Sequence, residues 1–554
     1  MNNQIRRQGD WETRRIFRSV SLSPLLLVVL LACTPIPTSD GSPAPRASST
    51  PVVAAPNVRT PVPTEVLPEG GAIAIGVIGN TTLEINVMPG IVQDAVFDSL
   101  LRVDPANGSL KPGLAESFQV SNDATTITFR LRAGVKWHNG APLTSDDVVA
   151  TIKAFSSPSF RGKPVTDFGT LSAVSAIDAQ TIQITFSDAY CPALASIGTL
   201  KILPRAIATN PSFPRLTPAQ MIGTGAMKFV SLSNDRFVLE RNTDYFAGAP
   251  HLDNLTIRLF ADAATMRTAF SAREIDAMPS DYTALQKIDG AKITTTNASE
   301  FVALMFNLDT PALNDPRVRQ ALSYALNRSV LQNDLAGQAT PINTSLLPGY
   351  WASPPNLPGY SFDVAKAQQT LSDAGWRDSG DGVLRNNGKP LRLDLWALAD
   401  DPMLEPLAFR IREMFAALGI QTQLQLDDRP GWVTRAFQHR FDLLLLARPI
   451  PLDPDQRWYW HSAENVKGSG FNFGSYANKN VDALLQAGTR VAACDANARA
   501  TIYSEIHRAL IADAPVVFLF VPKQSWATRE RVLNLAPSPF AGDFWNMSDW
   551  RVKP

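Results

Sequence analysis

Two apolar patterns alternate along residues 71–554, and together they limit the folds open to this chain. Apolar side chains recur at every second position in Thr125–Arg132 and Gln180–Phe186, as in half-buried strands. Other stretches begin with a capping aspartate, at Asp315 and Asp363, and an amphipathic helical pattern follows. Interleaved strands and helices predict an α/β or α+β fold, and 554 residues are enough for several domains.

The overall composition excludes two broad classes of protein. Lys and Arg number 51 and Asp and Glu also number 51, so the formal net charge is zero. Without a basic excess the chain lacks the electrostatic footprint of a general nucleic-acid binder, and we expect no nucleic-acid partner. Hydrophobic residues make up 45% and charged residues 18%, which is typical of a globular protein and not of a disordered one.

Residues 1–33 have the layout of an export signal. Several arginines precede the apolar run Leu25–Leu31, which is too short to span the roughly 20 residues of a bilayer. The run leads into Leu30–Cys33, which resembles a bacterial lipobox, and this resemblance implies cleavage before Cys33 and lipidation of its thiol. Thr13–Phe17 contains paired arginines and is also similar to a twin-arginine signal, so both export routes stay open.

Residues 34–70 are predicted to be a disordered tether. Nine prolines stand among Ser, Thr and Ala, with almost no large apolar side chain to bury. Such a composition cannot offset the loss of chain entropy on folding. The predicted protein is therefore a folded body, residues 71–554, held outside the cytoplasm on a lipid anchor.

Two cysteines, Cys191 and Cys494, remain in this body. They could pair outside the cytosol, but one pair so far apart in sequence is weak support for a disulfide. We therefore expect two buried, unpaired thiols.

A collinear series of motifs runs through the body. The motifs are Leu114–Phe118, Thr126–Gly140, Ala141–Val148, Ile222–Gly225, Asn242–Phe246, Phe306–Leu308, Asp315–Leu322 and Tyr476–Asp482. In this order they resemble the extracellular solute-binding proteins of the peptide/nickel family (family 5), which feed ABC importers. The likeness extends from about residue 71 to residue 521.

The resemblance implies a particular architecture: an α/β, two-lobed periplasmic-binding-protein-like fold (type II, cluster C) with an extra inserted domain. The implied parts are a first-lobe domain from residues 71–100, 215–298 and 512–554, an inserted domain over 101–214, and a second lobe over 299–511. Two chain crossings would form the hinge, and closure would enclose a small-molecule solute. The implied partners are an ABC permease with its ATPases, and the protein is expected to be a monomer.

No motif in the sequence has the spacing of an active site. The five histidines form no metal-ligand pair by spacing, and neither a phosphate-binding loop nor a Gly-x-Ser-x-Gly elbow is present. We predict no metal, no cofactor, no catalytic residue and no enzymatic activity. An active site in which a serine, a histidine and an aspartate come together only in the folded protein is left open by the sequence.

The stretch from Leu443 to Phe473 is the most informative about the ligand. In peptide binders of this family an aspartate follows the corresponding strand and holds the α-ammonium of the ligand. Alignment on Asp453–Asp455 places Ile450 there, and no acidic residue lies between Asp442 and Asp453. A buried ammonium without a counter-charge would cost several kcal/mol, which makes a free peptide N-terminus an awkward ligand.

Seven residues are predicted to bind the ligand. Arg448 could donate to an anionic group, or it could be a rim arginine paired to a carboxylate. One of Trp458 and Trp460 is expected to stack on the ligand, since neighbouring aromatics cannot point the same way. The polar candidates are Asn307 and Asn472 in the second lobe, and Asn80 and Thr82 in the first.

The sequence thus predicts the substrate-binding component of an ABC importer, with peptides or peptide-like solutes as its ligands. An oligosaccharide or another organic solute is the alternative ligand. A secreted hydrolase and a signalling receptor on the same fold are the alternatives from other classes.

Overall fold

The computed structural model describes residues 69–553, except for 159, 161–166, 281–287 and 356. The predicted signal peptide with Cys33 lies outside the described residues, and so does the predicted tether up to residue 68. In the described ranges, none of the helices combines the length and the apolar composition needed to cross a bilayer.

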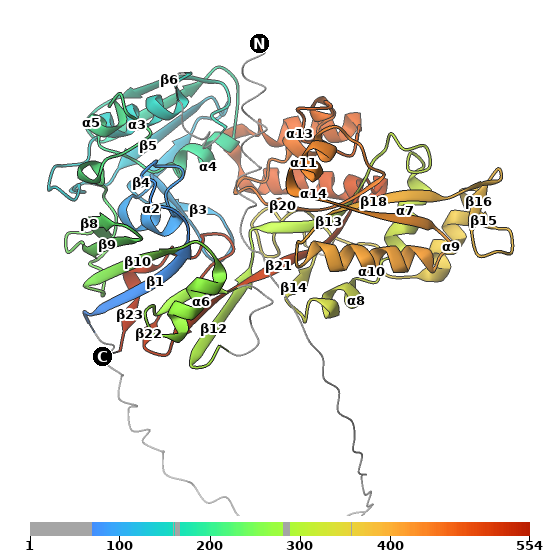
Figure 1. Ribbon diagram of the computed structural model, residues 1–554. Helices are drawn as coiled ribbons and strands as arrows, with labels where there is room; N and C mark the ends of the chain where they lie inside the picture. Colours follow the sequence, from blue (N-terminus) through green and yellow to red (C-terminus); the bar gives the residue numbers. More distant parts are fainter. Residues whose placement is uncertain (1–68, 159, 161–166, 281–287, 356, 554) are drawn as a thin grey trace, which may run out of the picture. The chain divides into compact units, whose positions relative to one another are not determined.

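A mixed sheet of 12 strands connects two hydrophobic cores (Figure 1). Its order is β19-β18-β20-β13-β21-β11-β1-β10-β9-β8, and β12 and β14 also pair with β21. One core consists of residues 301–521, and we call this part of the molecule lobe 2. The other core combines residues 73–277 with 526–552, and we call this part lobe 1. The two-lobed α/β fold expected from the sequence is confirmed; the domain boundaries stay predictions.

Lobe 1 contains one half of the large sheet and a separate sheet of four strands, β4-β5-β7-β6. Its elements outside residues 101–214 are β1 (Ala72–Ile78), α2 (Gly90–Val96), β8 (Met227–Ser233), β9 (Arg236–Arg241), β10 (Asn254–Phe260), α6 (Ala263–Ser271), β11 (Ala277–Ser280), β12 (Ala291–Asn297), β22 (Val532–Leu533) and β23 (Arg551–Val552). Its elements within 101–214 are β2 (Leu101–Val103), β3 (Leu110–Pro112), β4 (Ala115–Val120), β5 (Thr126–Leu131), α3 (Ser145–Ser156), β6 (Leu171–Ala176), β7 (Thr181–Phe186), α4 (Pro192–Gly198) and α5 (Arg205–Ala208).

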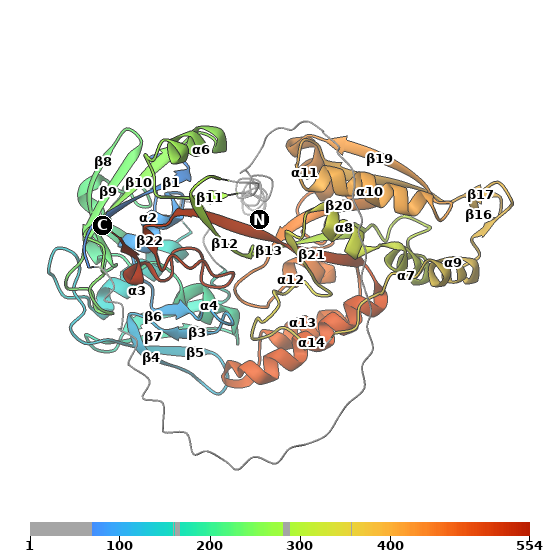
Figure 2. The same cartoon turned by 90° about the horizontal axis from the view of Figure 1, so that it is seen from below.

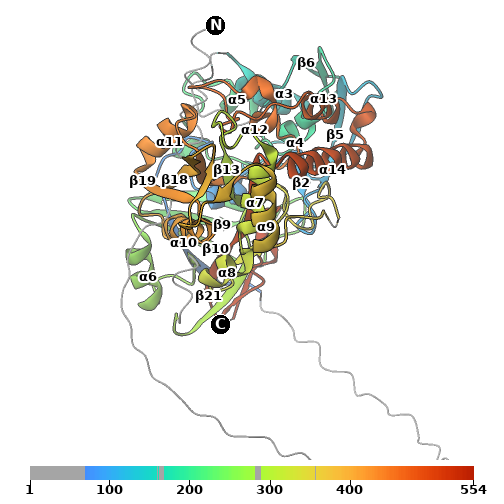
Figure 3. The same ribbon diagram turned by 90° about the vertical axis from the view of Figure 1, so that its right-hand side faces the viewer.

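Lobe 2 carries the other half of the sheet, and helices α7–α10 gather on the side that faces the viewer in Figure 3. Its strands are β13 (Glu300–Phe306), β14 (Ala339–Pro341), β15 (Arg377–Asp378), β16 (Leu384–Asn386), β17 (Lys389–Pro390), β18 (Arg392–Leu398), β19 (Gln421–Asp427) and β20 (Leu443–Pro449). Its helices are α7 (Pro316–Ala325), α8 (Arg328–Asp334), α9 (Val364–Asp373), α10 (Leu404–Ala416), α11 (Arg429–Phe437), α12 (Arg457–Trp460), α13 (Lys479–Gly488) and α14 (Ala496–Asp513).

Strand β21 (Val516–Arg529) belongs to both lobes. Its first part pairs with β13, and its last part pairs with β11 and β12. The side chains are buried along nearly the whole strand, but Lys523 and Gln524 are only half-buried, at the point where one core ends and the other begins. The second connection between the lobes is the short segment from β12 to β13.

The local signals read from the sequence correspond to observed elements. The Asp315 carboxylate accepts a hydrogen bond from the Arg317 amide at the start of α7, and Asp363 caps α9 in the same way. The motif Ile222–Gly225 has a steric cause, because a Cβ on Gly223 would lie 1.7 Å from the Val96 carbonyl oxygen. This motif is therefore explained by packing of the chain against the end of α2.

The expectation of two unpaired thiols is wrong: Cys191 and Cys494 form a disulfide. Their Cα atoms are 5.3 Å apart although 303 residues separate them in the sequence. Cys191 directly precedes α4 in lobe 1, whereas Cys494 lies between α13 and α14 in lobe 2. Sequence distance could not reveal the pair, because the two lobes bring it together only after folding.

Reducing this disulfide should lower the free energy of unfolding by about 2–5 kcal/mol, because the bridge restricts the unfolded chain over a long loop. Urea unfolding with and without dithiothreitol measures the effect, and Cys191→Ser should reproduce it without reductant. Cys33→Ser is the control, since it removes a thiol outside the described body. Equal midpoints with and without reductant would contradict the prediction.

Candidate ligand-binding site

The carboxyl end of β20 lies where the two lobes meet. Pro449 at this end is paired with Glu300, the first residue of β13, and the next amide, that of Ile450, donates to the Ser299 carbonyl at 2.8 Å. The Ser299 hydroxyl in turn donates to the carbonyl of Pro539 in lobe 1, also at 2.8 Å. The segment after β20 therefore starts at the junction of the lobes.

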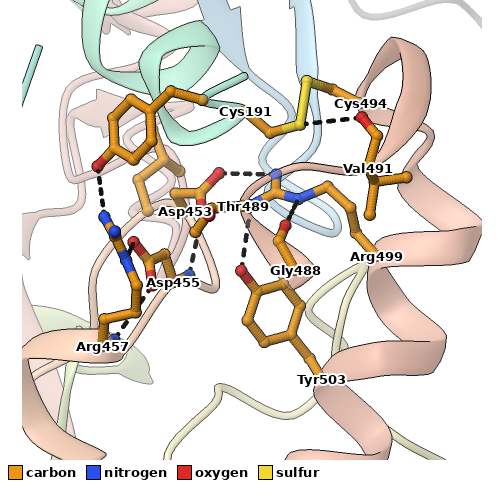
Figure 4. Close-up of polar contacts among 12 residues, drawn as sticks. Cys191, Asp453, Asp455, Arg457, Gly488, Thr489, Val491, Cys494, Arg499 and Tyr503 are labelled. Carbon is orange, nitrogen blue, oxygen red and sulfur yellow. Dashed lines mark hydrogen bonds and ion pairs between the residues drawn. A yellow bond between two sulfur atoms is a disulfide. The ribbon is translucent and has the colours of Figure 1, made fainter. Parts of the chain in front are cut away.

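Two carboxylates hold the loop that follows β20 (Figure 4). The Arg499 guanidinium donates to both oxygens of Asp453, at 2.6 and 2.8 Å, and both side chains are largely buried. Asp455 accepts from Arg457 at 2.8 Å, and burial raises the pKa of the Asp455 carboxyl to about 6. Arg457 also donates to the hydroxyl of Tyr190 in lobe 1, at 3.1 Å.

Sequence reasoning did not find Arg499 and Tyr190. They lie 46 and 267 residues from their partners in the loop, and neither stands in a motif that would have indicated the contact. The loop is thus fixed within lobe 2 and touches lobe 1, which places its side chains at the interface between the lobes.

Arg448 lies inside lobe 2 near this loop. Its guanidinium stacks between the rings of Tyr459 and Phe473, at 4.4 and 4.3 Å from their centroids, and donates to the Phe471 carbonyl at 2.8 Å. The residue is 4% exposed. The arginine is thus well supported by aromatic faces; its role toward a ligand stays a prediction.

The two candidate tryptophans have different surroundings. Trp460 is 1% exposed, donates from Nε1 to the Gln456 side chain at 2.9 Å, and meets Phe518 edge-on. Trp458 is only partly buried against the same core. Of the two, Trp458 is therefore the ring that a ligand could reach.

The four polar candidates are spread over both lobes. The Asn307 amide donates to two backbone carbonyls, of His439 and Phe441, at the end of β13 farthest from Glu300, and it lines a cavity of about 440 Å³ there. The Asn472 amide donates to the carbonyls of His461 and Tyr476 within its own loop.

Asn80 and Thr82 follow β1 in lobe 1. Asn80 accepts a hydrogen bond from the Thr82 amide at 3.0 Å, and both residues are at least partly exposed. The structure does not gather the seven predicted residues into one cluster, and Asn307 in particular is distant along its strand from the junction of the lobes.

Glu300 is a further acidic residue at this junction. Burial, together with the neighbouring charge of Asp401, raises the pKa of its carboxyl to about 7, against the opposing effect of Arg429. Glu300 is paired with Pro449, so it stands next to Ile450, the residue that the sequence prediction places where peptide binders have an acid. Sequence reasoning missed it because the two strands are about 150 residues apart in the chain.

Within the described ranges, two serine–histidine pairs meet in space, and neither is arranged as a catalytic triad. Ser475 contacts His439 and itself donates to Asp309, so the serine and not the histidine stands between the other two groups. Ser345 contacts the buried His507, whose other ring nitrogen bonds to the Tyr503 carbonyl and not to an acid. Among the described residues there is also no group of three His, Cys, Asp or Glu side chains suited to a metal ion.

A continuous sheet through two lobes, with a loop fixed at their junction, is the architecture of a two-lobed solute-binding protein. Residues 109–469 match the model of the bacterial extracellular solute-binding proteins, family 5. The chain belongs to this family.

Known relatives extend the match over most of the chain. The oligopeptide-binding protein AppA of Bacillus subtilis is 27% identical over 506 residues, covering 87% of this chain and 92% of AppA. The structure of AppA with a nonapeptide superposes with a TM-score of 0.66 and 26% identity, over 88% of this chain and all of that one. NikZ of Campylobacter jejuni, solved with Ni(L-His), gives a TM-score of 0.68 and 26% identity, over 87% and 99%.

The tryptophan pair provides a direct test of the site. Trp460→Ala should destabilise the fold by about 3–5 kcal/mol, because it empties a buried ring site. Trp458→Ala should leave the fold nearly unchanged and weaken ligand binding by about 1–3 kcal/mol. Urea unfolding and titration calorimetry on both variants measure the two effects. Wild-type affinity in Trp458→Ala would remove this ring from the site.

Proposed function

We propose that this protein is the extracytoplasmic substrate-binding component of an ABC importer. It captures peptides or peptide-like small solutes between its two lobes and delivers them to a permease. The observation that carries this proposal is the family match over residues 109–469, which includes the whole loop at the junction of the lobes. AppA, which is similar along nearly its full length, is named as an oligopeptide-binding protein.

The cysteine chemistry supports a location outside the cytoplasm. Structural disulfides persist in oxidising compartments and are rare in the cytosol. The pair Cys191–Cys494 is a disulfide of this kind, and the predicted lipidation of Cys33 would hold the protein at the membrane surface.

The charges at the junction support a ligand with a positive group. Glu300 and Asp401 supply two carboxyl groups, and Arg429 is the basic group acting on Glu300. A ligand ammonium close to Glu300 would stabilise the ionised form of this carboxylate, and the carboxylate would in turn neutralise the ammonium. Although position 450 is an isoleucine, Glu300 and Asp401 therefore supply acidic groups at this end of the lobe.

Mass spectrometry of the small molecules that copurify with the protein, released by denaturation, tests the ligand class. A series of peptide masses would support the proposal. One defined sugar or other organic mass would instead favour the non-peptide alternative with the same transport role. Release of a processed product from added peptides would favour a hydrolase and contradict the proposal.

Glu300→Gln should weaken binding of a peptide with a free amino terminus at least tenfold at pH 7.5, because it removes the ionised partner of the ammonium. Wild-type affinity should rise as the pH increases through about 7, where the free carboxyl ionises, and the variant should not follow this rise. Calorimetry from pH 5.5 to 8 measures both. Glu413→Gln, at an exposed glutamate of α10 paired with Arg410, is the matched control; equal loss in both variants would contradict a role for Glu300.

Cys33→Ser should release the protein from membranes, because the lipidated thiol is the proposed anchor. Fractionation of cells expressing the wild type and the variant, followed by immunoblotting, gives the distribution. Cys494→Ser is the control that keeps the anchor. Unchanged membrane association of Cys33→Ser would contradict the lipobox interpretation.

A further inference from the structure

The two lobes are joined covalently at a place other than the two chain crossings. The Cys191–Cys494 disulfide connects the residue before α4 in lobe 1 with the connection between α13 and α14 in lobe 2 (Figure 4). Figure 2 shows that β21 runs from one half of the molecule to the other, whereas α14 belongs to lobe 2. The lobes therefore have three covalent connections, two through the backbone and one through the disulfide.

Noncovalent contacts surround the bridge on both sides. The Cys191 amide donates to the Thr489 carbonyl at 2.8 Å, and the Ala493 amide donates to the Asn122 carbonyl at 3.1 Å. Each of these hydrogen bonds crosses from one lobe to the other.

A second cross-lobe contact lies beside the bridge. Arg457 of lobe 2 donates to the Tyr190 hydroxyl, and its guanidinium lies 3.8 Å from Asp167 of lobe 1. Tyr190 directly precedes Cys191, so the ionic contact and the disulfide belong to one patch, which we call the lobe clamp (Tyr190, Cys191, Arg457 and Cys494).

The covalent and the noncovalent parts of the lobe clamp differ in what they permit. A hydrogen bond or a partly exposed ion pair is worth only about 1 kcal/mol and can break and reform during a lobe movement. A disulfide keeps its two Cα atoms within about 4.4–6.8 Å of each other. Any rotation at β21 that moves α4 away from the α13–α14 connection is therefore blocked while the bond is intact.

We propose that the Cys191–Cys494 disulfide is a redox-dependent restraint on the separation of the two lobes. The oxidised protein moves only by pivoting about the bridge and the crossing strands, and reduction extends the range of lobe arrangements. This property concerns the molecule without ligand and does not depend on which solute it carries.

The two cysteine residues differ in exposure, which indicates how the restraint is released. Cys191 is 1% exposed, whereas Cys494 is half-buried. A thiolate of an external dithiol reductant attacks the Cys494 sulfur, the S–S bond breaks, and Cys191 leaves as a thiolate that takes up a proton. The second thiol of the reductant then displaces Cys494, so that the protein gains two electrons and two protons and the reductant becomes a disulfide.

Single-molecule FRET on the full-length chain tests the proposal. Azide-bearing amino acids replace Val230 in lobe 1 and Val364 in lobe 2, which are 50% and 41% exposed, and the dyes are attached without using cysteine. In a Cys33→Ser background the only thiols are those of the disulfide. We expect dithiothreitol to broaden the FRET distribution and shift it toward longer distances, and we expect Cys191→Ser to show this wider distribution with or without reductant.

Three results would overturn the proposal. They are identical distributions before and after reduction of the wild type, an equal effect of dithiothreitol on Cys191→Ser, or two free thiols in the untreated, denatured protein by Ellman titration. If Cys191→Ser does not fold, Cys494→Ala replaces it, and the wild type measured with and without reductant still decides. Because no ligand is added, a negative result here leaves the proposed transport role intact, and a failed ligand search leaves the restraint intact.

Discussion

Strand β21 is the element on which the rest of the structure depends. It contributes a buried strand to lobe 2, passes the junction at the half-buried residues Lys523 and Gln524, and continues as a buried strand of lobe 1. A strand that lies in two cores cannot be lost from one without disturbing the other. At Lys523 and Gln524 the side chains of the strand leave both cores, which is where a hinge between the lobes would lie.

The loop after β20 shows how charge can fix a segment at such a junction. The side chains of Asp453 and Asp455 are largely buried, and each forms an ion pair with an arginine of lobe 2. Breaking a buried pair costs about 3–5 kcal/mol, because the remaining charge is left uncompensated. The loop is therefore held in one arrangement, and Arg457 is positioned to meet Tyr190 of the other lobe.

The lobes are consequently connected by three physically different means: a shared strand, an ionic and hydrogen-bonded patch, and a disulfide. Two-lobed binding proteins close around a ligand by hinge and shear movements of their lobes. In this chain the disulfide adds a covalent attachment away from the two chain crossings, and we propose that it restrains the movement of the lobes. We propose that Glu300 and Trp458 contact the ligand at the junction of the lobes.

Much of the fold was predictable from local patterns. Strands β5 and β7 follow from period-two alternation, and α7 and α9 follow from their capping aspartates, because these signals act between neighbouring residues. The two-lobed architecture followed from the order of the motifs in the resembled family. The site was less predictable than the fold. Trp460 packs against Phe518 in the core, whereas Trp458 is partly exposed to a ligand. This difference depends on which face of one helical turn meets the core, and the sequence does not reveal that face.

By itself, therefore, the sequence determined the fold class, several of the strands and helices, the predicted export signal and the family. Only the tertiary structure decided that Cys191 pairs with Cys494, that Glu300 stands beside Ile450, and that Arg499 holds Asp453. The physical reason is the range of the interactions. Propensity, capping and periodicity act over a few residues, whereas a disulfide, a strand register or a buried ion pair joins positions whose proximity exists only in the folded chain.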